Sequence, residues 1–534
     1  MQKNKREATG GIISGALSLT ISTVIVKILG LVYKIPLSNF LGDEGMGYFN
    51  SAYTVYAFFY LLCTAGVPKA VMILVSEAKA KGKAVEEEAI VRVASLAFLI
   101  FGSVITASFV TFSSPLSRFI GNEGARATMI AIAPSIIFIS LAGVIRGYLS
   151  ANLRLLDIAV SQIIEGVGKL ALGLIFAILA IRRGMSVQMV SAFTILGVTF
   201  GAVAGLLYLF ICSKNQLSKE KTEQNEEVAI NNRAIMKRML SISVPITLSA
   251  AVMSLTNIID LTLIMRGLRG IGYTDVEASA LYGNYTTLAV PMFNLAISLV
   301  TPISIAFLPT FTRARVCGNR ELLSEALATA LRLTSMIAAP LLIGMTLFSR
   351  EILALLFGNS GVETGATLLC LLTPAIFFSS VLLCVNSALE AGGQVRAPVI
   401  SMIFGSVAKI FVSSYLLTNS DFGISGAPIG TVISYAVALL VSGIIYLKKA
   451  SISLPIIRSS LSPYIAAIIS VMASRVFYSS VISRLGDMLS LALSILMAAV
   501  IYCILLLLTG NLSRAIFEKT AKYTKIPDKN YQLS

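Results

Sequence analysis

Two lysines in a long apolar segment, Lys27 and Lys34, are the residues whose type and spacing point most directly to chemistry. They lie in the stretch 11–41, GIISGALSLTISTVIVKILGLVYKIPLSNFL. Seven residues make about two helical turns, so both ammonium groups leave one face of a helix, about 10 Å apart along its axis. A charge near the bilayer centre costs at least about 2.5–3.5 kcal/mol, which favours a cavity that receives an anion. Snorkelling toward the membrane surface is the alternative, and it has more weight for Lys34, which is nearer the outer end.

A second charged set follows in a later apolar run. Gln162, Glu165 and Lys169 stand at positions i, i+3 and i+7, so they share one helix face, and we expect that face to point inward. Arg146, near the end of the preceding run, joins Glu165 and Lys169 as a candidate substrate ligand. Because Glu165 and Lys169 are four residues apart, an ion pair between them that only permits their burial is the alternative.

A lone carboxylate, Asp260, lies midway through another apolar run and is flanked by Asn257 and Thr262. Such a group could bind Na⁺ or carry a proton, and the alternative is a partner for a lysine such as Lys27. The chain has no histidine, so carboxylates are the side chains best suited to carry protons. Asn284 is a further candidate for substrate binding, with a hydrogen bond between helices as its alternative.

The composition indicates the setting of these groups. Of 534 residues, 56% are hydrophobic and 13% are charged, which is typical of an all-α polytopic membrane protein. We count about fourteen apolar runs long enough to cross a bilayer and expect the first to be a retained helix, not a cleaved signal. The runs are 11–37, 46–74, 91–112, 127–150, 156–181, 187–212, 241–265, 279–311, 323–348, 364–390, 396–418, 424–446, 461–482 and 486–509.

The net charge of +16 comes from Lys and Arg in short loops between these runs. Their distribution predicts that both termini are cytoplasmic, and it does not indicate nucleic-acid binding. The six cysteines form no C-x-x-C pair, so disulfides and metal clusters are poorly supported, and the absence of histidine excludes a zinc-histidine site and a Ser-His-Asp triad. We therefore expect no catalytic site and no cofactor, apart from Na⁺ or H⁺ as a coupling ion.

The two halves of the chain repeat each other at a nearly constant offset. Tyr48 and Asn50 recur 234 residues later as Tyr282 and Asn284, and Lys169 recurs 240 residues later as Lys409. Each copy has six spans. Because six is even, the second copy starts on the same side of the membrane as the first, so the copies have the same orientation and form a parallel repeat. The last two spans have no counterpart and are an addition. We predict these parts: an N-lobe 1–213, a cytoplasmic linker 214–238, a C-lobe 239–450, spans 13 and 14 in 451–512, and a basic cytoplasmic tail 513–534.

Several segments resemble the multidrug/oligosaccharidyl-lipid/polysaccharide flippase superfamily, and within it the group of stage V sporulation protein B and the lipid II flippases. The resemblance covers nearly the whole chain and includes LGDEGMGYF from Leu41 to Phe49 and AGVPKAV followed by SEAKAKG. The segment from Ile145 to Lys169, IRGYLSANLRLLDIAVSQIIEGVGK, also resembles this superfamily. Tyr33 and Lys34 stand where the lipid II flippases have an Arg-Asp pair, and the arginines expected in spans 2 and 8 are absent.

The resemblance implies a transporter in the bacterial cytoplasmic membrane that moves an undecaprenyl-diphosphate-linked sugar precursor from the inner to the outer leaflet by alternating access. It implies a cationic cavity for the head group, a groove at spans 13 and 14 for the lipid tail, and Na⁺ binding at Asp260. Lipid II is the substrate we favour, with the lipid bilayer and this lipid-linked glycan as partners and a monomer as the working unit.

Three other functions remain open from the sequence. The first is a flippase for another lipid-linked polysaccharide unit. The second is a cation-coupled multidrug exporter, against which a cationic cavity argues because it repels cationic drugs. The third is an integral-membrane glycan polymerase or glycosyltransferase, which normally shows acid/base or metal-binding residues beside a sizeable extramembrane loop.

Overall fold

The computed structural model describes residues 2–81, 84–220, 231–316, 320–358, 361–394, 396–450 and 456–510. Within its helices, some side chains also lie outside the described part: those of 2–29, 31, 32, 80, 84, 214–220, 248–250, 252, 253, 305, 309, 316, 450, 456–459 and 483–485. Lys27 is in a helix, but its side chain belongs to that set. The predicted tail 513–534 and part of the predicted linker 214–238 are outside the described residues as well.

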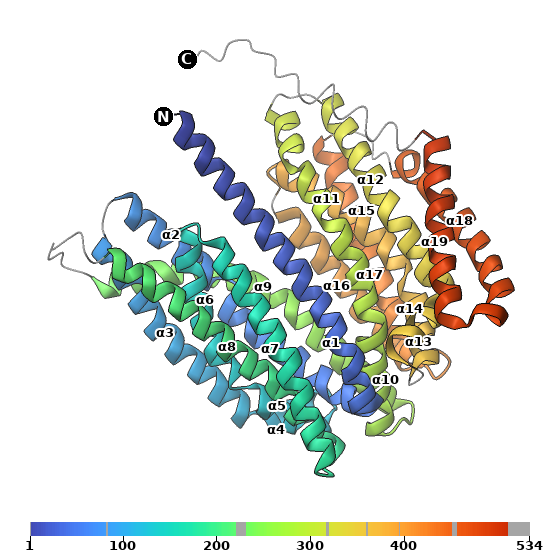
Figure 1. Cartoon of the computed structure of the whole chain (residues 1–534), viewed down its shortest axis with the longest axis horizontal. Helices are drawn as coiled ribbons and strands as arrows, with labels where there is room; N and C mark the ends of the chain where they lie inside the picture. The colour runs from blue at the N-terminus through green and yellow to red at the C-terminus, as the bar shows by residue number, and fades with distance from the viewer. Residues whose placement is uncertain are drawn as a thin grey trace. The chain divides into compact units, whose positions relative to one another are not determined.

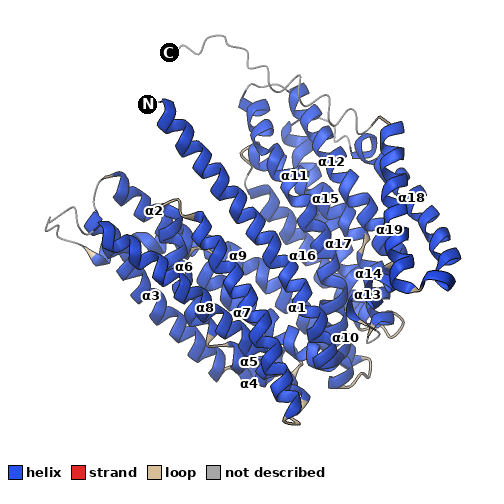
Figure 2. Ribbon diagram, in the orientation of Figure 1, coloured by secondary structure: helices blue, strands red, loops and turns tan. Residues whose placement is uncertain are grey.

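The residues that the structure describes form helices joined by short turns, with no strand among them (Figure 2). This confirms the predicted all-α class. The helices of the first half are α1 (Gln2–Thr64), α2 (Val67–Ala80), α3 (Ala84–Thr111), α4 (Ser113–Ile120), η1 (Glu123–Ala125), α5 (Arg126–Ile132), α6 (Ser135–Ala151), α7 (Leu155–Arg182), α8 (Val187–Glu220), α9 (Asn232–Gly270) and α10 (Asp275–Asn284). Those of the second half are η2 (Tyr285–Ala289), α11 (Val290–Val316), α12 (Arg320–Leu347), α13 (Ser349–Phe357), α14 (Val362–Leu372), α15 (Pro374–Ala391), α16 (Arg396–Leu417), η3 (Gly423–Ser425), α17 (Gly426–Ala450), α18 (Ile456–Leu485) and α19 (Asp487–Leu508).

The number of membrane-spanning helices agrees roughly with the predicted fourteen. Eleven helices in the described part are long and apolar enough to cross a membrane, or twelve if α5 and α6, bent by 43°, form one span. These twelve correspond to all predicted spans except 11–37 and 241–265, which include residues whose side chains are outside the described part. The chain is therefore a multi-pass membrane protein.

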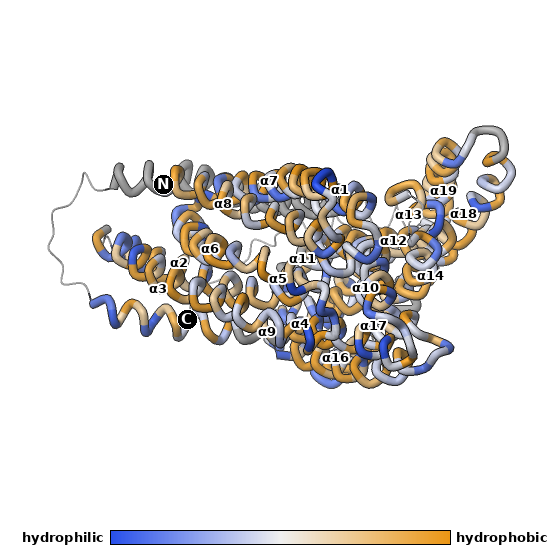
Figure 3. The backbone as a smooth tube through the Cα atoms, turned by 90° about the horizontal axis from the view of Figure 1, so that it is seen from below, coloured by the Kyte–Doolittle hydropathy of each residue, from blue (hydrophilic) through white to orange (hydrophobic). Residues whose placement is uncertain are grey.

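The surfaces of these helices have the character that a lipid environment requires. On α3, Leu96, Ile100 and Val104 follow each other at four-residue spacing and are 57–61% exposed. An exposed apolar stripe of this kind is stable against acyl chains, whereas water would disfavour it. Figure 3 shows hydrophobic stretches along most helices of the chain.

The longest helix is interrupted at the loop predicted between the first two spans. α1 has a non-helical residue at Gly42, whose φ of 66° and ψ of −178° suit glycine because it has no Cβ. Asp43 and Glu44, which lie between the predicted spans 11–37 and 46–74, follow immediately. A second break lies at Gly66, between α1 and α2. Here a Cβ would stand 2.2 Å from the carbonyl oxygen of Ser243 on α9, so these helices touch through the missing side chain.

The chain divides into two compact units. The first comprises Met1–Thr287 and Leu417–Ile424, and the second comprises Leu288–Leu416 and Ser425–Ser534. The chain passes from the first to the second inside η2, a π-helix. The predicted lobe boundaries, at 213 and 239, stay predictions.

The order of helices in the second unit repeats that of the first, as the sequence offsets predicted. In each, a 28-residue helix, α3 or α12, is followed by a short helix, α4 or α13, and by a second short helix, α5 or α14. A medium helix, α6 or α15, and two long helices, α7 and α8 or α16 and α17, complete the series (Figure 1). α18 and α19 come after this series and pack against each other.

Candidate functional site

The first unit encloses a cavity of about 310 Å³ between α1, α6, α7 and α8. This volume is at the lower end of the usual range for pockets that hold small ligands, about 300–1,000 Å³. Its lining combines aromatic, cationic, anionic and amide side chains. The lining residues are Tyr53, Tyr56, Ala57, Tyr60, Arg146, Gln162, Glu165, Gly166, Lys169 and Val198.

Three of the predicted site residues, Arg146, Glu165 and Lys169, meet in this cavity, together with Gln162 of the same predicted helix face. α6 and α7 are joined by a short turn, so the side chain of Arg146 on α6 reaches that of Glu165 on α7, nineteen residues later in the chain. Its Nη2 atom lies 2.8 Å from Oε2 of Glu165, and the side chains are 12% and 25% exposed. The carboxylate of Glu165 thus pairs across the hairpin, and the ion pair with Lys169 that we considered as an alternative is not formed.

The guanidinium of Arg146 is only partly satisfied by this ion pair. Its Nε atom is buried and has no hydrogen-bond partner among the described residues. A buried donor without an acceptor costs about 1–3 kcal/mol, which an incoming oxygen atom would recover. The geometry therefore prepares Arg146 for an additional acceptor.

Lys169 carries a positive charge that the surrounding described residues do not neutralise with a carboxylate. Its Nζ atom lies 4.6 Å from the ring centroid of Tyr53 and 5.5 Å from that of Tyr33. Contacts of this type stabilise a cation by about 0.5–2 kcal/mol but leave its charge in place. The ammonium is thus held by aromatic faces at the cavity wall, where it attracts an anion.

The aromatic wall of the cavity belongs to α1. Tyr53, Tyr56 and Tyr60 stand at i, i+3 and i+7 and so share a helix face. The ring centroids of Tyr53 and Tyr56 are 5.6 Å apart, and those of Tyr56 and Tyr60 are 6.0 Å apart. Phe49 stacks on Tyr53 with nearly parallel rings, at a centroid distance of 6.3 Å. Sequence reasoning did not identify these tyrosines, although their spacing was the available signal.

Glycines fix α7, the helix of Glu165 and Lys169, against α8. A Cβ at Gly201 would stand 2.6 Å from the carbonyl oxygen of Glu165 and 2.8 Å from the backbone nitrogen of Lys169. At Gly197 a Cβ would meet the backbone of Gly173 at 2.5 Å. Small residues allow membrane helices to approach closely, and the two helices lie side by side along their length (Figure 1). Close packing of backbones thus holds the charged face of α7 in place.

Two other candidates, Lys34 on α1 and Asn284 on α10, form hydrogen bonds between α1 and the α10–η2 segment and do not line the cavity. Nζ of Lys34 donates to the carbonyl oxygen of Thr286 at 2.8 Å, and Nδ2 of Asn284 donates to Oδ2 of Asp43 at 3.3 Å. Beside them, Nδ2 of Asn50 donates to Oγ1 of Thr287 at 2.8 Å. These bonds join α1 to α10 and η2, as the alternative for Asn284 proposed. Substrate roles for Lys34 and Asn284 stay predictions.

The remaining two candidates are placed only in part. Asp260 lies on α9 with a half-buried side chain and is not one of the residues that line the cavity. Lys27 lies on α1, and its side chain is outside the described residues. Coupling through Asp260 and anion binding through Lys27 stay predictions.

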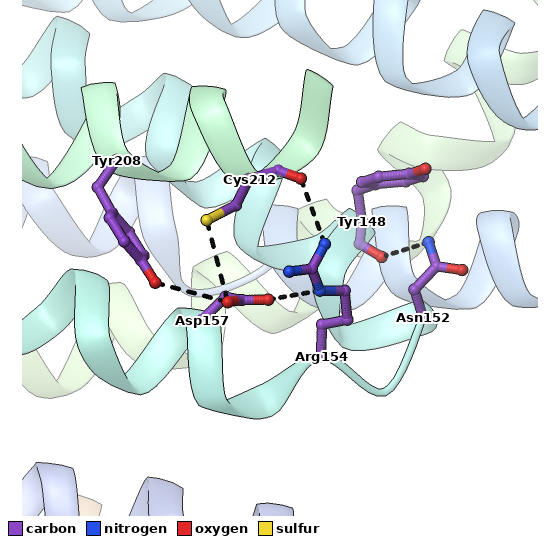
Figure 4. Close-up of polar contacts among 6 residues, drawn as sticks. All are labelled: Tyr148, Asn152, Arg154, Asp157, Tyr208 and Cys212. Atoms are coloured by element: carbon purple, nitrogen blue, oxygen red, sulfur yellow. Dashed lines mark hydrogen bonds and ion pairs between the residues drawn. The ribbon is translucent and has the colours of Figure 1, made fainter. Parts of the chain in front are cut away.

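A second polar cluster lies at the turn between α6 and α7 (Figure 4). Arg154 Nε lies 2.5 Å from Oδ2 of Asp157, and Arg154 Nη1 donates to the carbonyl oxygen of Cys212 at 3.3 Å. Asp157 Oδ1 also accepts from the Tyr208 hydroxyl at 3.5 Å and from the Cys212 thiol at 3.9 Å. Leu153, in the turn, has a φ of 56°, which is uncommon for a residue with a Cβ. The cluster clamps this turn to α8.

Two sets of similarly ordered membrane-spanning helices, with a charged cavity inside one unit, define a membrane transporter of the multidrug/oligosaccharidyl-lipid/polysaccharide flippase superfamily. The chain belongs to the polysaccharide biosynthesis protein family, whose model matches residues 12–315. The MatE family model matches residues 284–415. These matches confirm the superfamily that the sequence motifs predicted.

Relatives and solved structures agree with this assignment. The chain is 24% identical to stage V sporulation protein B of Bacillus subtilis (strain 168) over 501 residues, 93% of this chain and 95% of that one. It is 26% identical to the lipid II flippase MurJ of the same organism over 460 residues, 82% of each chain. These relatives place it in the group of stage V sporulation protein B and the lipid II flippases.

Solved structures with a similar fold agree with this assignment. A structure of the lipid II flippase MurJ in an inward closed conformation aligns with a TM-score of 0.68 at 16% identity, covering 93% of this chain and 99% of that one. An inward-facing multidrug resistance MATE family transporter aligns with a TM-score of 0.66 at 16% identity, covering 82% and 98%. The named neighbours are flippases and transporters, in agreement with the prediction of a transporter and not an enzyme.

Proposed function

We propose that this protein is a flippase that moves an undecaprenyl-diphosphate-linked cell-wall precursor, lipid II, from the inner to the outer leaflet by alternating access. The observation that carries the proposal is the ammonium of Lys169, which lies at a cavity wall within membrane-spanning helices without a neutralising carboxylate among the described residues. A diphosphate would repay the burial of such a charge through charge-assisted hydrogen bonds. The relationship to a lipid II flippase supports this choice of substrate.

Further elements of the proposal come from the sequence. Lys27 and Lys34 would assist Lys169 in binding the diphosphate, and Asp260 would bind Na⁺ or carry H⁺ as the coupling ion. Both termini would lie in the cytoplasm, and a monomer would suffice. No bond of the substrate is made or broken.

A test of the substrate uses a bacterial host whose own lipid II flippase is depleted. We expect the wild-type chain to restore growth and to translocate lipid II in vesicles made from these cells. If it does neither, lipid II is not the substrate. A flippase for another lipid-linked glycan is then the second candidate, which the match of residues 12–315 to the polysaccharide biosynthesis protein family favours.

A test of the cavity uses the same assay with Lys169→Met, which keeps the side-chain length and removes the charge. We expect translocation to fall by at least about tenfold, because a charged hydrogen bond to substrate contributes about 1.5–3 kcal/mol. Lys169→Arg should retain most of the activity. Lys448→Met, at an exposed lysine in the last turn of α17, is the matched control and should have little effect. Equal activity of Lys169→Met and wild type would contradict a role of this cavity in anion binding.

A further inference from the structure

The cavity of the first unit has two chemically different ends. At one end, Lys169 lies over the ring of Tyr53. At the other end, Tyr60 lines the cavity together with Glu165 and Arg146, which form an ion pair. Tyr53 and Tyr60 are seven residues apart on α1, so the two ends are separated by about 10 Å along the helix axis. One end suits an anion, and the other offers an aromatic ring beside paired charges and an amide.

The Tyr60 end has the chemistry that recognises a sugar ring. The partly exposed aromatic ring offers a face for the apolar C–H side of a pyranose. Glu165 uses Oε2 for its ion pair with Arg146, so Oε1 is left outside that pair and can accept from hydroxyl groups. Gln162, which also lines the cavity, adds a side-chain amide that both donates and accepts.

The buried Arg146 Nε atom is the second observation that points to a ligand. It has no hydrogen-bond partner among the described residues, although the Nη2 atom of the same guanidinium is paired. A neutral oxygen, such as a hydroxyl or an acetamido carbonyl, would satisfy this donor without displacing Glu165. A cationic ligand is disfavoured, because Arg146 and Lys169 both line the cavity.

We propose that Tyr60, Gln162, Glu165 and Arg146 form a subsite for the first sugar of a lipid-linked glycan. On α7, Glu165 and Gln162 lie about 6 and 10 Å along the helix axis from Lys169, which is at the end that would hold the diphosphate. The inference rests on the proposed function and deepens it, because it assigns the carbohydrate part of the substrate to named side chains. A volume of about 310 Å³ suits a small part of a head group and not a whole oligosaccharide.

The test measures binding of two radiolabelled lipids to the purified full-length protein in nanodiscs. One lipid is undecaprenyl diphosphate, and the other is the same lipid carrying one N-acetylated aminosugar. We expect the wild type to bind the glycosylated lipid more tightly, and Tyr60→Leu to lower that preference by about three- to tenfold through loss of ring stacking. Tyr60→Phe keeps the ring and should keep the preference.

Two further variants and a control distinguish loss of sugar binding from loss of diphosphate binding and from misfolding. Gln162→Leu should also lower the preference for the glycosylated lipid while the bare diphosphate still binds. Lys169→Met should weaken both lipids by the same factor and leave their ratio unchanged. Tyr415→Leu, at a tyrosine on α16 that is 73% exposed, is the aromatic control and should bind both lipids as wild type does.

The outcomes distinguish the two proposals. If both lipids bind and Lys169→Met weakens them, but Tyr60→Leu and Gln162→Leu leave the preference unchanged, the sugar subsite is overturned and the proposed function stands. If the wild type binds neither lipid, the proposed function fails and the subsite fails with it.

Discussion

The α6–α7 hairpin carries two arginine–carboxylate pairs, and they differ in how completely they are satisfied. Near the turn, Arg154 pairs with Asp157, and Asp157 also accepts from the Tyr208 hydroxyl and the Cys212 thiol. Eight residues deeper in each helix, Arg146 pairs with Glu165, and Arg146 Nε is left without a partner among the described residues. The outer pair, Arg154–Asp157, fixes the turn. The inner pair, Arg146–Glu165, faces a cavity, and its Arg146 Nε atom is available to donate a hydrogen bond.

The difference teaches which charges in a membrane protein are structural. A pair whose atoms bond to a neighbouring helix, as Arg154 and Asp157 bond to Tyr208 and Cys212 of α8, stabilises one local conformation. A pair with an unused donor, beside an ammonium held only by aromatic rings, carries an energetic cost that a bound substrate can reduce. Substitutions at the two ends of the hairpin should therefore separate into effects on transport and effects on folding.

The largest effect is expected from Arg146→Met. It leaves the Glu165 carboxylate, 25% exposed, without its cation, so we expect the free energy of unfolding to fall by about 2–4 kcal/mol. Translocation of lipid II in vesicles should fall by at least about tenfold, because the guanidinium also lines the cavity in which we propose that the substrate binds. Thermal unfolding of the purified protein and the vesicle assay measure the two effects.

A double substitution separates these two roles of Arg146. Arg146→Met with Glu165→Gln removes the unpaired charge and should restore most of the stability without restoring transport. If the double variant also regains transport, the guanidinium acts only on folding and the inner pair is no different in kind from the outer one.

A smaller effect is expected from Gly201→Ala, which changes the position of α7 without changing a charge. The added Cβ would meet two backbone atoms at 2.6 and 2.8 Å, so α7 and α8 must move apart, at a cost of about 1–3 kcal/mol. Because Glu165 and Lys169 move with α7, we expect translocation to fall several-fold. The control is Gly344→Ala on α12, where a Cβ meets nothing within 4 Å and alanine should be neutral or slightly stabilising. A Gly201→Ala protein with normal transport would show that the cavity tolerates displacement of α7.

The sequence predicted the class, the approximate spans and the three charged residues that meet in the cavity, because composition, the length of apolar runs and local spacing are sufficient for each. It did not predict which cation pairs with Glu165. Spacing along one helix offers Lys169, four residues away, whereas the hairpin brings Arg146, which is nineteen residues away. That choice is decided by packing between helices, which periodicity within one helix does not encode.

The tyrosine wall was missed for a related reason. Tyr53, Tyr56 and Tyr60 have helical spacing, but an aromatic stripe in a membrane helix is as compatible with the core or with lipid as with a cavity. Only the position of α7 opposite this face makes it a wall of the site. The loop that follows Gly42 was easier to predict, because a polar Asp43-Glu44 pair between two apolar runs marks a loop in the sequence itself.

The smallest effect is expected from Asp157→Asn, which tests the outer pair. Asparagine keeps the shape and one carbonyl acceptor, so Arg154 loses a charged partner but retains its bond to the Cys212 carbonyl oxygen. Arg154 is 37% exposed and Asp157 is 18% exposed, so the free energy of unfolding should fall by only about 1 kcal/mol. Translocation should stay within about twofold of wild type, because neither residue lines the cavity. Transport as low as that of Arg146→Met in a protein that still folds would mean that the turn takes part in the transport cycle, and the division between a structural and a functional end of this hairpin would be wrong.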